Sequence, residues 1–280
     1  MQRWIHKNIL MHVHSHPASY AYKEKTSPRD AAAMHAGCKW MIKLGATNFF
    51  ESILEPDVYR VFREMGYQAL VAFELARICT RVRPSGNPVK TDRFKDGMGN
   101  LPCKNVAIGH LPQGAATSPL LSNLVARTLD HSLAEFANSK DLAYTRYADD
   151  LTFSSFGTFN RDGAENIVRE IYEIMRAHGL WPNKSKTKII PPGARKVVLG
   201  LLADGHVPKL SKEFKAEVRT HIHFMLRPDV GVSNHRKARK FDNSWGLKNF
   251  IFGKLAYAQA IEPIWTSRMR DLFMKIDWDS

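Results

Sequence analysis

Two adjacent aspartates, Asp149 and Asp150, are the side chains of this sequence best suited to chemistry. They lie between two segments, 144–147 and 151–155, in which β-branched and aromatic residues alternate with other types, and this pattern predicts a β-hairpin with both carboxylates at its tip. Neighbouring carboxylates repel each other, and a divalent cation between them lets both stay ionised at neutral pH. The pair therefore indicates a metal site. The alternative is an acidic turn without a chemical role, because Asp is a common turn residue.

Four further segments carry residues that can serve such a site. Residues 43–53 contain paired phenylalanines after a predicted strand, and residues 111–123 begin with Leu-Pro-Gln-Gly and lead into a helix. Ser118 is the predicted N-cap of that helix, with Pro119 at its first position. Residues 179–187 contain Pro-Asn-Lys-Ser-Lys-Thr, and residues 198–201 are Val-Leu-Gly-Leu.

In this order, the segments resemble the sequence blocks of reverse transcriptases. The Tyr-Ala-Asp-Asp hairpin resembles the catalytic signature of that family, and residues 111–123 resemble its Pro-Gln-Gly block. Tyr20-Ala21-Tyr22, His35-Ala36-Gly37 and the tail 256–269 are similar to retron-type bacterial reverse transcriptases in particular. Several ordered blocks are far more specific than one motif.

One position departs from the family pattern. Gly45 stands where the family has its first catalytic aspartate, so one of three metal-binding carboxylates is absent, and neither Asn48 nor Glu51 is an obvious substitute. Two interpretations follow. The first is an RNA-directed DNA polymerase whose activity is impaired at Gly45. The second is a nucleic-acid-binding pseudo-polymerase that has kept the fold and lost the chemistry.

The resemblance implies nucleotidyl transfer assisted by two Mg²⁺ ions, with Mn²⁺ as a substitute. A primer hydroxyl attacks the α-phosphorus of a deoxynucleoside triphosphate. Asp149 would bridge the metals, Asp150 would assist on the primer side, and the backbone carbonyl of Ala46 would bind the nucleotide's metal ion. Lys186 would assist the departure of pyrophosphate, although its residue type and position also fit an ordinary surface lysine.

The resemblance also implies a nucleotide pocket formed by Ala46, Phe50, Gln113 and Gly114. Phe50 matches the steric gate of the family, in which a ring beneath the sugar excludes a 2′-hydroxyl. Gln113 would contact the incoming nucleotide. From the residue types alone, Phe50 equally fits the core beside Phe49, and Gln113 equally fits a cap of the loop backbone.

The charge of the chain favours a polynucleotide partner. There are 41 Lys and Arg against 27 Asp and Glu, a formal net charge of +14, which attracts a phosphate backbone through counterion release. A basic run in the C-terminal part is the predicted nucleic-acid contact, with a solvated helical face as the equal alternative. It comprises Arg236, Lys237, Arg239 and Lys240. The resemblance implies a structured noncoding RNA as template and primer, an RNA/DNA hybrid, and an effector protein in phage defence.

The predicted fold class is α+β, a right-hand polymerase with partial fingers, a βαββαβ-like palm and a helical thumb. The fingers would comprise residues 1–40 and 54–110 and are short at the N-terminus, the palm 41–53 and 111–205, and the thumb 206–280. Apolar spacing and capping signals predict the elements. Helices are expected at 2–10, from Ser27 to near Gly37, and at 56–65, 67–81, 118–137 and 161–178; strands at 40–44, 186–190 and 196–203; and a loop or hairpin insertion at 82–110.

Cysteine usage and hydropathy bear on the compartment. The three cysteines, Cys38, Cys79 and Cys103, are widely separated and have no zinc-site spacing, which is typical of a reducing cytosol. No apolar run has the length of a membrane span. We therefore expect a cytoplasmic protein with no membrane partner, and the resemblance to retron-type reverse transcriptases implies that it is bacterial.

Overall fold

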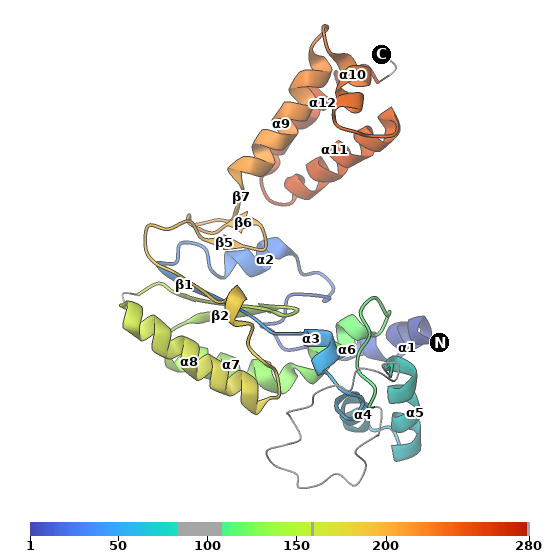
Figure 1. Cartoon of the computed structure of the whole chain (residues 1–280), viewed down its shortest axis with the longest axis vertical. Helices are drawn as coiled ribbons and strands as arrows, with labels where there is room; N and C mark the ends of the chain where they lie inside the picture. The colour runs from blue at the N-terminus through green and yellow to red at the C-terminus, as the bar shows by residue number, and fades with distance from the viewer. Residues whose placement is uncertain (83–107, 158–159, 279–280) are drawn as a thin grey trace. The chain divides into compact units, whose positions relative to one another are not determined.

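The computed structural model describes residues 1–82, 108–157 and 160–278 (Figure 1). Nearly all of the predicted insertion at 82–110, with Cys103, lies outside the described residues. The chain forms two compact units. The larger unit comprises residues 1–34 and 38–194, and the smaller unit comprises 35–37 and 195–280. Helices and strands are mixed in both, as the predicted α+β class requires.

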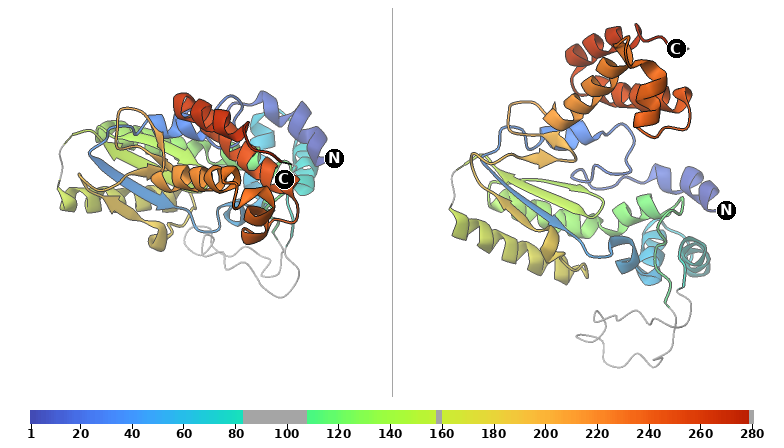
Figure 2. Two further views of the ribbon diagram at one scale, coloured as in Figure 1. Left: turned by 90° about the horizontal axis from the view of Figure 1, so that it is seen from above. Right: turned by 45° about the horizontal axis from the view of Figure 1, so that its top comes forward.

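A four-stranded sheet forms the centre of the larger unit. Its strands are β1 (Trp40–Gly45), β2 (Ala143–Tyr147), β3 (Asp150–Ser155) and β4 (Lys188–Ile190), in the order β2-β3-β1-β4, and every neighbouring pair is antiparallel. Figure 2 shows the β2–β3 hairpin beside the blue β1 strand. The register sets Gly45 opposite Asp150 and Asp150 opposite Tyr147. The end of β1 therefore lies at the hairpin tip.

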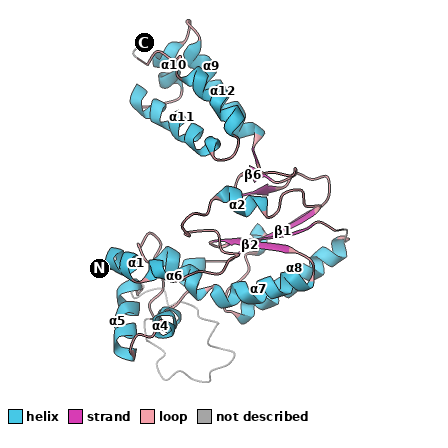
Figure 3. Cartoon of the chain, turned by 180° about the vertical axis from the view of Figure 1, so that it is seen from behind, coloured by secondary structure: helices cyan, strands magenta, loops and turns pink. Residues whose placement is uncertain are grey.

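One face of this sheet is covered by helices. Helices α7 (Arg127–Ser139) and α8 (Arg161–Ala177) lie side by side along it in Figures 1 and 3. Apolar side chains of the strands and helices form one core, because alternate strand residues point to the same face. Its fully buried members include Leu44, Leu151, Phe153, Leu133 and Ile171.

The predicted helix 118–137 is wrong as a single element. The structure has α6 (Ser118–Val125) and then α7, with a break at Ala126, where ψ is 0°. Thr117 rather than Ser118 is the N-cap residue, and its side chain makes no capping hydrogen bond. The apolar spacing continues across the break, so it could not reveal the change of direction.

The remaining elements of the larger unit begin at local sequence signals, although two helices end earlier than predicted. The helix expected from Ser27 to near Gly37 ends at Ala33, and the helix expected at 2–10 ends at Asn8 and is followed by a 3-10 turn. Ser27 and Asp30 form the predicted capping box at the start of α2, and Gly179, with φ of +72°, follows α8 as predicted. The elements are α1 (Gln2–Asn8), η1 (Leu10–His12), α2 (Pro28–Ala33), α3 (Phe49–Ser52), α4 (Glu55–Glu64), α5 (Ala69–Cys79) and η3 (Lys184–Lys186).

The smaller unit combines a short sheet with four helices. Its strands, in the order β5-β6-β7, are β5 (Val197–Val198), β6 (Leu201–Leu202) and β7 (Lys209–Leu210). Its helices are α9 (Lys212–Leu226), α10 (Gly231–Ala238), α11 (Ser244–Gln259) and α12 (Pro263–Phe273), and they enclose a separate apolar core. Figure 3 shows these helices in cyan.

The predicted strand 196–203 is also wrong. The segment is a tight hairpin that turns at Leu199 and Gly200, whose φ angles are +50° and +82°. Leu rarely adopts this left-handed conformation, so the turn was not expected. Likewise, the predicted strand 186–190 begins only at Lys188, because Lys186 ends η3. Residues 195–205, which were predicted to belong to the palm, cluster with the smaller unit. The division into fingers, palm and thumb stays a prediction.

Candidate active site

The tip of the β2–β3 hairpin is held on both sides. Ala148 has φ of +55°, an uncommon conformation for alanine, and its carbonyl accepts a hydrogen bond from Arg146 Nη1 at 3.1 Å. The backbone N–H of Ala46, just after β1, donates to the carbonyl of Asp149 at 2.9 Å. The predicted hairpin is confirmed, and these contacts fix Asp149 and Asp150 against the end of β1.

Lys186 lies against both carboxylates. Its Nζ is 2.7 Å from Asp149 Oδ2 and 3.8 Å from Asp150 Oδ1. The hydrogen bond to Asp149 raises the pKa of Lys186. Burial, together with the charge of Asp149, raises the pKa of Asp150, and Lys186 opposes that rise. The structure thus brings together the three predicted catalytic side chains.

Gly45 lies beneath the side chain of Lys186. A Cβ atom at position 45 would be 2.5 Å from Lys186 Cδ and 3.2 Å from Lys186 Cβ. Backbone hydrogen bonds join the two segments, since the Asn183 N–H donates to the Gly45 carbonyl at 2.7 Å and the Thr47 N–H donates to the Trp181 carbonyl at 2.8 Å. The lysine stem occupies the space directly over Gly45.

The predicted nucleotide-pocket residues lie on neighbouring segments of the larger unit. Phe50 is half-buried, and its ring centroid is 5.6 Å from that of Phe49. Gln113 Nε2 donates to Glu51 Oε1 at 3.0 Å, which joins the loop at residues 111–117 to α3. Gly114 has φ of +84°, which explains a glycine there. Ala46 is buried. Their nucleotide-binding roles stay predictions.

Tyr22, which the sequence singled out only through the family resemblance of residues 20–22, is a further residue near this site. Its side chain is 45% exposed, and its ring centroid is 6.4 Å from that of Phe50. Partial burial raises the pKa of Tyr22, and the charges of Tyr147 and Asp149 raise it further. Tyr22 therefore lies near the predicted sugar gate and within electrostatic range of the hairpin tip. No local signal at Tyr22 predicts this position.

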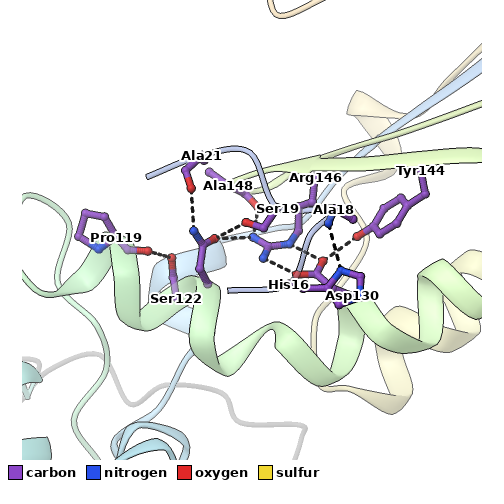
Figure 4. Close-up of polar contacts among 11 residues, drawn as sticks. His16, Ala18, Ser19, Ala21, Pro119, Ser122, Asp130, Tyr144, Arg146 and Ala148 are labelled. Atoms are coloured by element: carbon purple, nitrogen blue, oxygen red, sulfur yellow. Dashed lines mark hydrogen bonds and ion pairs between the residues drawn. The ribbon is translucent and has the colours of Figure 1, made fainter. Parts of the chain in front are cut away.

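A buried polar network supports the hairpin from the side of α7 (Figure 4). Arg146 Nη2 and Nε donate to Asp130 Oδ2 and Oδ1 at 2.6 and 2.7 Å, and Tyr144 OH donates to Asp130 Oδ1 at 2.8 Å. Arg146 Nη1 also donates to Asn123 Oδ1 at 3.1 Å. The signal in the sequence was the alternation of β2, which puts Arg146 on the same buried face as Tyr144 and therefore requires a buried partner.

The four residues of the basic run differ in their exposure to solvent. Lys237, Arg239 and Lys240 are exposed at and after the C-terminal end of α10. Arg236 is half-buried, and its Nη1 donates to the carbonyls of Phe241 and Asp242 at 3.2 and 2.7 Å. Arg236 therefore satisfies backbone carbonyls after the helix, whereas the other three side chains are open to solvent.

Neither a cluster of metal-binding side chains nor a membrane helix occurs in the described part of the chain. Among residues 1–82, 108–157 and 160–278, no group of three or more His, Cys, Asp or Glu side chains could hold a metal ion. Within the same ranges, no helix is long and apolar enough to cross a membrane.

The chain belongs to the reverse transcriptase (RNA-dependent DNA polymerase) family, whose model matches residues 1–215. Within the family it is a retron-type member, which confirms the resemblance. Retron Ec86 reverse transcriptase of Escherichia coli is 30% identical over 81% of this chain, and retron Ec83 reverse transcriptase of the same species is 30% identical over 96%. The chain spans 62% of the length of the first relative and 77% of the second.

Telomerase from Candida albicans matches 92% of this chain and 47% of its own, with 11% sequence identity and a TM-score of 0.45.

Proposed function

We propose that this chain is the polymerase part of a retron-type RNA-directed DNA polymerase. The observation that supports this most directly is the pair Asp149 and Asp150 at a hairpin tip held against the end of β1. Its template-primer would be a structured noncoding RNA, extended as an RNA/DNA hybrid with deoxynucleoside triphosphates. In this proposal the sheet β1–β4 lies in the palm, which comprises residues 41–53 and 111–205, residues 1–40 and 54–110 belong to the fingers, and residues 206–280 form the thumb. We also propose that the chain acts with an effector protein in phage defence.

Reverse transcriptases use divalent metal ions, and the residues of this site do not fit the expected pair of Mg²⁺ ions. Asp149 and Asp150 offer two carboxylates and Ala46 a backbone carbonyl, but Gly45 offers no side chain, and the ammonium of Lys186 is 2.7 Å from Asp149 Oδ2. Magnesium requires near-octahedral oxygen ligands at about 2.0–2.1 Å. We therefore propose that DNA synthesis by the chain as it stands is strongly impaired.

Other side chains would position the substrates. In the proposal, the ring of Phe50 lies beneath the sugar of the incoming nucleotide, and Gln113, held by Glu51, contacts that nucleotide. Lys186 would donate to the phosphate groups after leaving Asp149. The exposed side chains Lys237, Arg239 and Lys240 would contact phosphates of the template-primer, which orients the duplex without reading its sequence.

Primer extension on a primed RNA template tests the proposal. We expect little synthesis from the unmodified chain with Mg²⁺ or Mn²⁺, and a gain of about two orders of magnitude or more in Gly45→Asp, because members of a catalytic carboxylate set act as a unit. Adding Asp149→Ala should abolish that gain. Robust synthesis by the unmodified chain that disappears in Asp149→Ala would contradict impairment and mean that another group completes the site.

A second candidate function is that of a pseudo-polymerase, which binds RNA without copying it. Two observations favour it: Lys186 forms an ion pair with Asp149, and position 45 carries no carboxylate. Filter binding of the same primed RNA separates the two. If Gly45→Asp and Asp149→Ala bind RNA as the unmodified chain does, and Gly45→Asp synthesises no DNA, the pseudo-polymerase is supported. If Gly45→Asp restores synthesis, the other catalytic residues are functional and the pseudo-polymerase is excluded.

A further inference from the structure

We propose that Lys186 occupies the metal position of this site as an internal cation, and that Gly45 permits this because it has no side chain. This inference takes one point from the proposed function, namely that Asp149 and Asp150 form the metal site of a polymerase. Binding of a metal ion to the full chain tests it without any DNA synthesis.

Steric contact couples position 45 to Lys186. A Cβ at position 45 would come within 2.5 Å of Lys186 Cδ, 3.2 Å of its Cβ and 3.4 Å of its Cγ. Any side chain there, a carboxylate included, would displace the lysine stem from its path across the end of β1. Lys186 can therefore occupy its present position only because residue 45 is a glycine and not the family's aspartate.

The charges at the hairpin tip favour the same arrangement. Asp149 and Asp150 are adjacent, and Asp150 is paired in register with Gly45 and Tyr147, which carry no positive charge. The charge of Lys43 also acts on Asp150, but less strongly than that of Lys186. The ammonium of Lys186 lies within 4 Å of both carboxylates, at 2.7 and 3.8 Å. One positive charge at that point relieves the repulsion that a divalent ion otherwise relieves.

The backbone that carries Lys186 is held next to β1. Asn183 donates its N–H to the Gly45 carbonyl, and its own carbonyl accepts from the Lys186 N–H at 3.1 Å. The Asn183 side chain caps η3 by accepting from the Ser185 N–H at 3.1 Å. The side chain of Lys186 nevertheless remains 47% exposed. It can therefore leave the aspartates without any movement of the backbone.

A metal ion and the lysine ammonium then exclude each other. A divalent ion can bind Asp149 and Asp150 only when Lys186 turns into solvent, and an incoming triphosphate offers the lysine new anionic partners there. The site would exist in two states, one closed by the lysine and one open to metal. The apparent metal affinity would be the affinity of the open state multiplied by the fraction of molecules in that state.

The test titrates Mn²⁺ alone into the full chain and follows free Mn²⁺ by electron paramagnetic resonance. Lys186→Met keeps the length of the stem and removes its charge, so we expect Mn²⁺ affinity to rise about tenfold or more. Lys184→Met makes the same charge change at an exposed position of the same short helix and should alter affinity less than about twofold. Asp149→Asn added to Lys186→Met should remove the gain.

Gly45→Ala tests the steric half of the inference. The added methyl group supplies no ligand, yet it should displace the stem of Lys186 and raise Mn²⁺ affinity as well. Because both changes open the same site, Gly45→Ala should add less than about twofold on top of Lys186→Met. Independent, multiplying gains, or no gain in Gly45→Ala, would overturn the proposed pairing of Gly45 with Lys186.

Thermal unfolding supplies a second readout. Lys186→Met should lower the melting temperature without metal, because the two carboxylates lose the cation that lies within 4 Å of both, and saturating Mn²⁺ should restore it. Lys184→Met should show neither effect. If Lys186→Met changes neither Mn²⁺ affinity nor melting temperature, Lys186 is an incidental surface contact and the inference is wrong. Failure of every variant to synthesise DNA would count against the proposed function and leave these results unaffected.

Discussion

The guanidinium of Arg146 and the carboxylate of Asp130 form an ion pair that is closed off from solvent, with Nη2 and Oδ2 2.6 Å apart and both side chains 1% exposed or less. Tyr144 and Asn123 complete their hydrogen bonds, and a further Arg146 N–H donates to the carbonyl of Ala148 in the hairpin loop. The pair therefore connects helix α7 to the first strand of the hairpin whose tip carries the two aspartates.

Removing one partner of this pair should be costly. We expect Arg146→Met to lower the free energy of unfolding by about 3–5 kcal/mol, because Asp130 is left charged and buried without its cation. Arg127→Met, which removes an exposed pair with Glu64, should cost about 1 kcal/mol or less. Urea denaturation measures both, and a cost for Arg146→Met as small as that of the control would contradict a structural role. Adding Asp130→Leu should recover part of the loss.

A buried histidine pair makes the smaller unit sensitive to acid. His221 Nδ1 lies 2.9 Å from His235 Nε2, and burial, followed by the charges of His235 and Arg239, lowers the pKa of His221 to about 4, which Glu217 only partly opposes. Unfolded histidine has a pKa near 6.5, so between these values the unfolded state binds more protons than the folded state. Stability from this group is complete near pH 7 and falls as the pH drops from about 6.5 to 4.

The contribution of His221 to the loss of stability at pH 4, relative to pH 7, should reach about 3 kcal/mol. His221→Gln, which does not titrate, should flatten this dependence, and His223→Gln, at an exposed position of the same helix, should leave it unchanged. Denaturant midpoints at several pH values report the difference. An equally steep pH dependence in His221→Gln and the unmodified chain would assign the acid sensitivity to other groups.

Phe50 is predicted to act as the sugar gate. In a Gly45→Asp background, Phe50→Ala should raise the incorporation of ribonucleotides relative to deoxynucleotides about tenfold or more, because the ring no longer excludes the 2′-hydroxyl. Phe49→Ala is the matched control. Its ring is buried in the core, so it should cost about 3–5 kcal/mol of stability without changing sugar selectivity. Loss of stability in Phe50→Ala with unchanged selectivity would make Phe50 a core residue.

RNA binding is predicted to depend on the exposed part of the basic run. Changing Lys237, Arg239 and Lys240 together to Gln should weaken binding and reduce the slope of log affinity against log salt by about 0.7–0.9 for each phosphate that is no longer neutralised. Arg236 is left intact because it binds backbone carbonyls. The control changes three exposed arginines of α8 to Gln, namely Arg161, Arg169 and Arg176. A slope that stays the same in the first variant would remove the run from the interface.

What the sequence by itself determined is local or depends on residue type. The hairpin at residues 144–155 is predictable because strand alternation and a two-residue turn are encoded by neighbours, and the Ser27 capping box and the stop at Gly179 are equally local. The prediction that Gly45 replaces a catalytic aspartate also came from the sequence. The predictions that were wrong, the helix across Ala126 and the strand across Leu199, concern backbone conformations to which these residue types give no local signal.

Only the tertiary structure decided which distant residues meet. Gly45 and Lys186 lie far apart in the chain, as do Asp130 and the hairpin residues it supports, and sheet pairing and helix packing bring them together. The position of Lys186 depends on an empty volume above β1 and on hydrogen bonds from Asn183, neither of which is a property of any one segment. The sequence therefore predicted a missing carboxylate at Gly45, and the fold revealed that Lys186 lies over that position, because volume and charge at a site are set by all the segments that surround it.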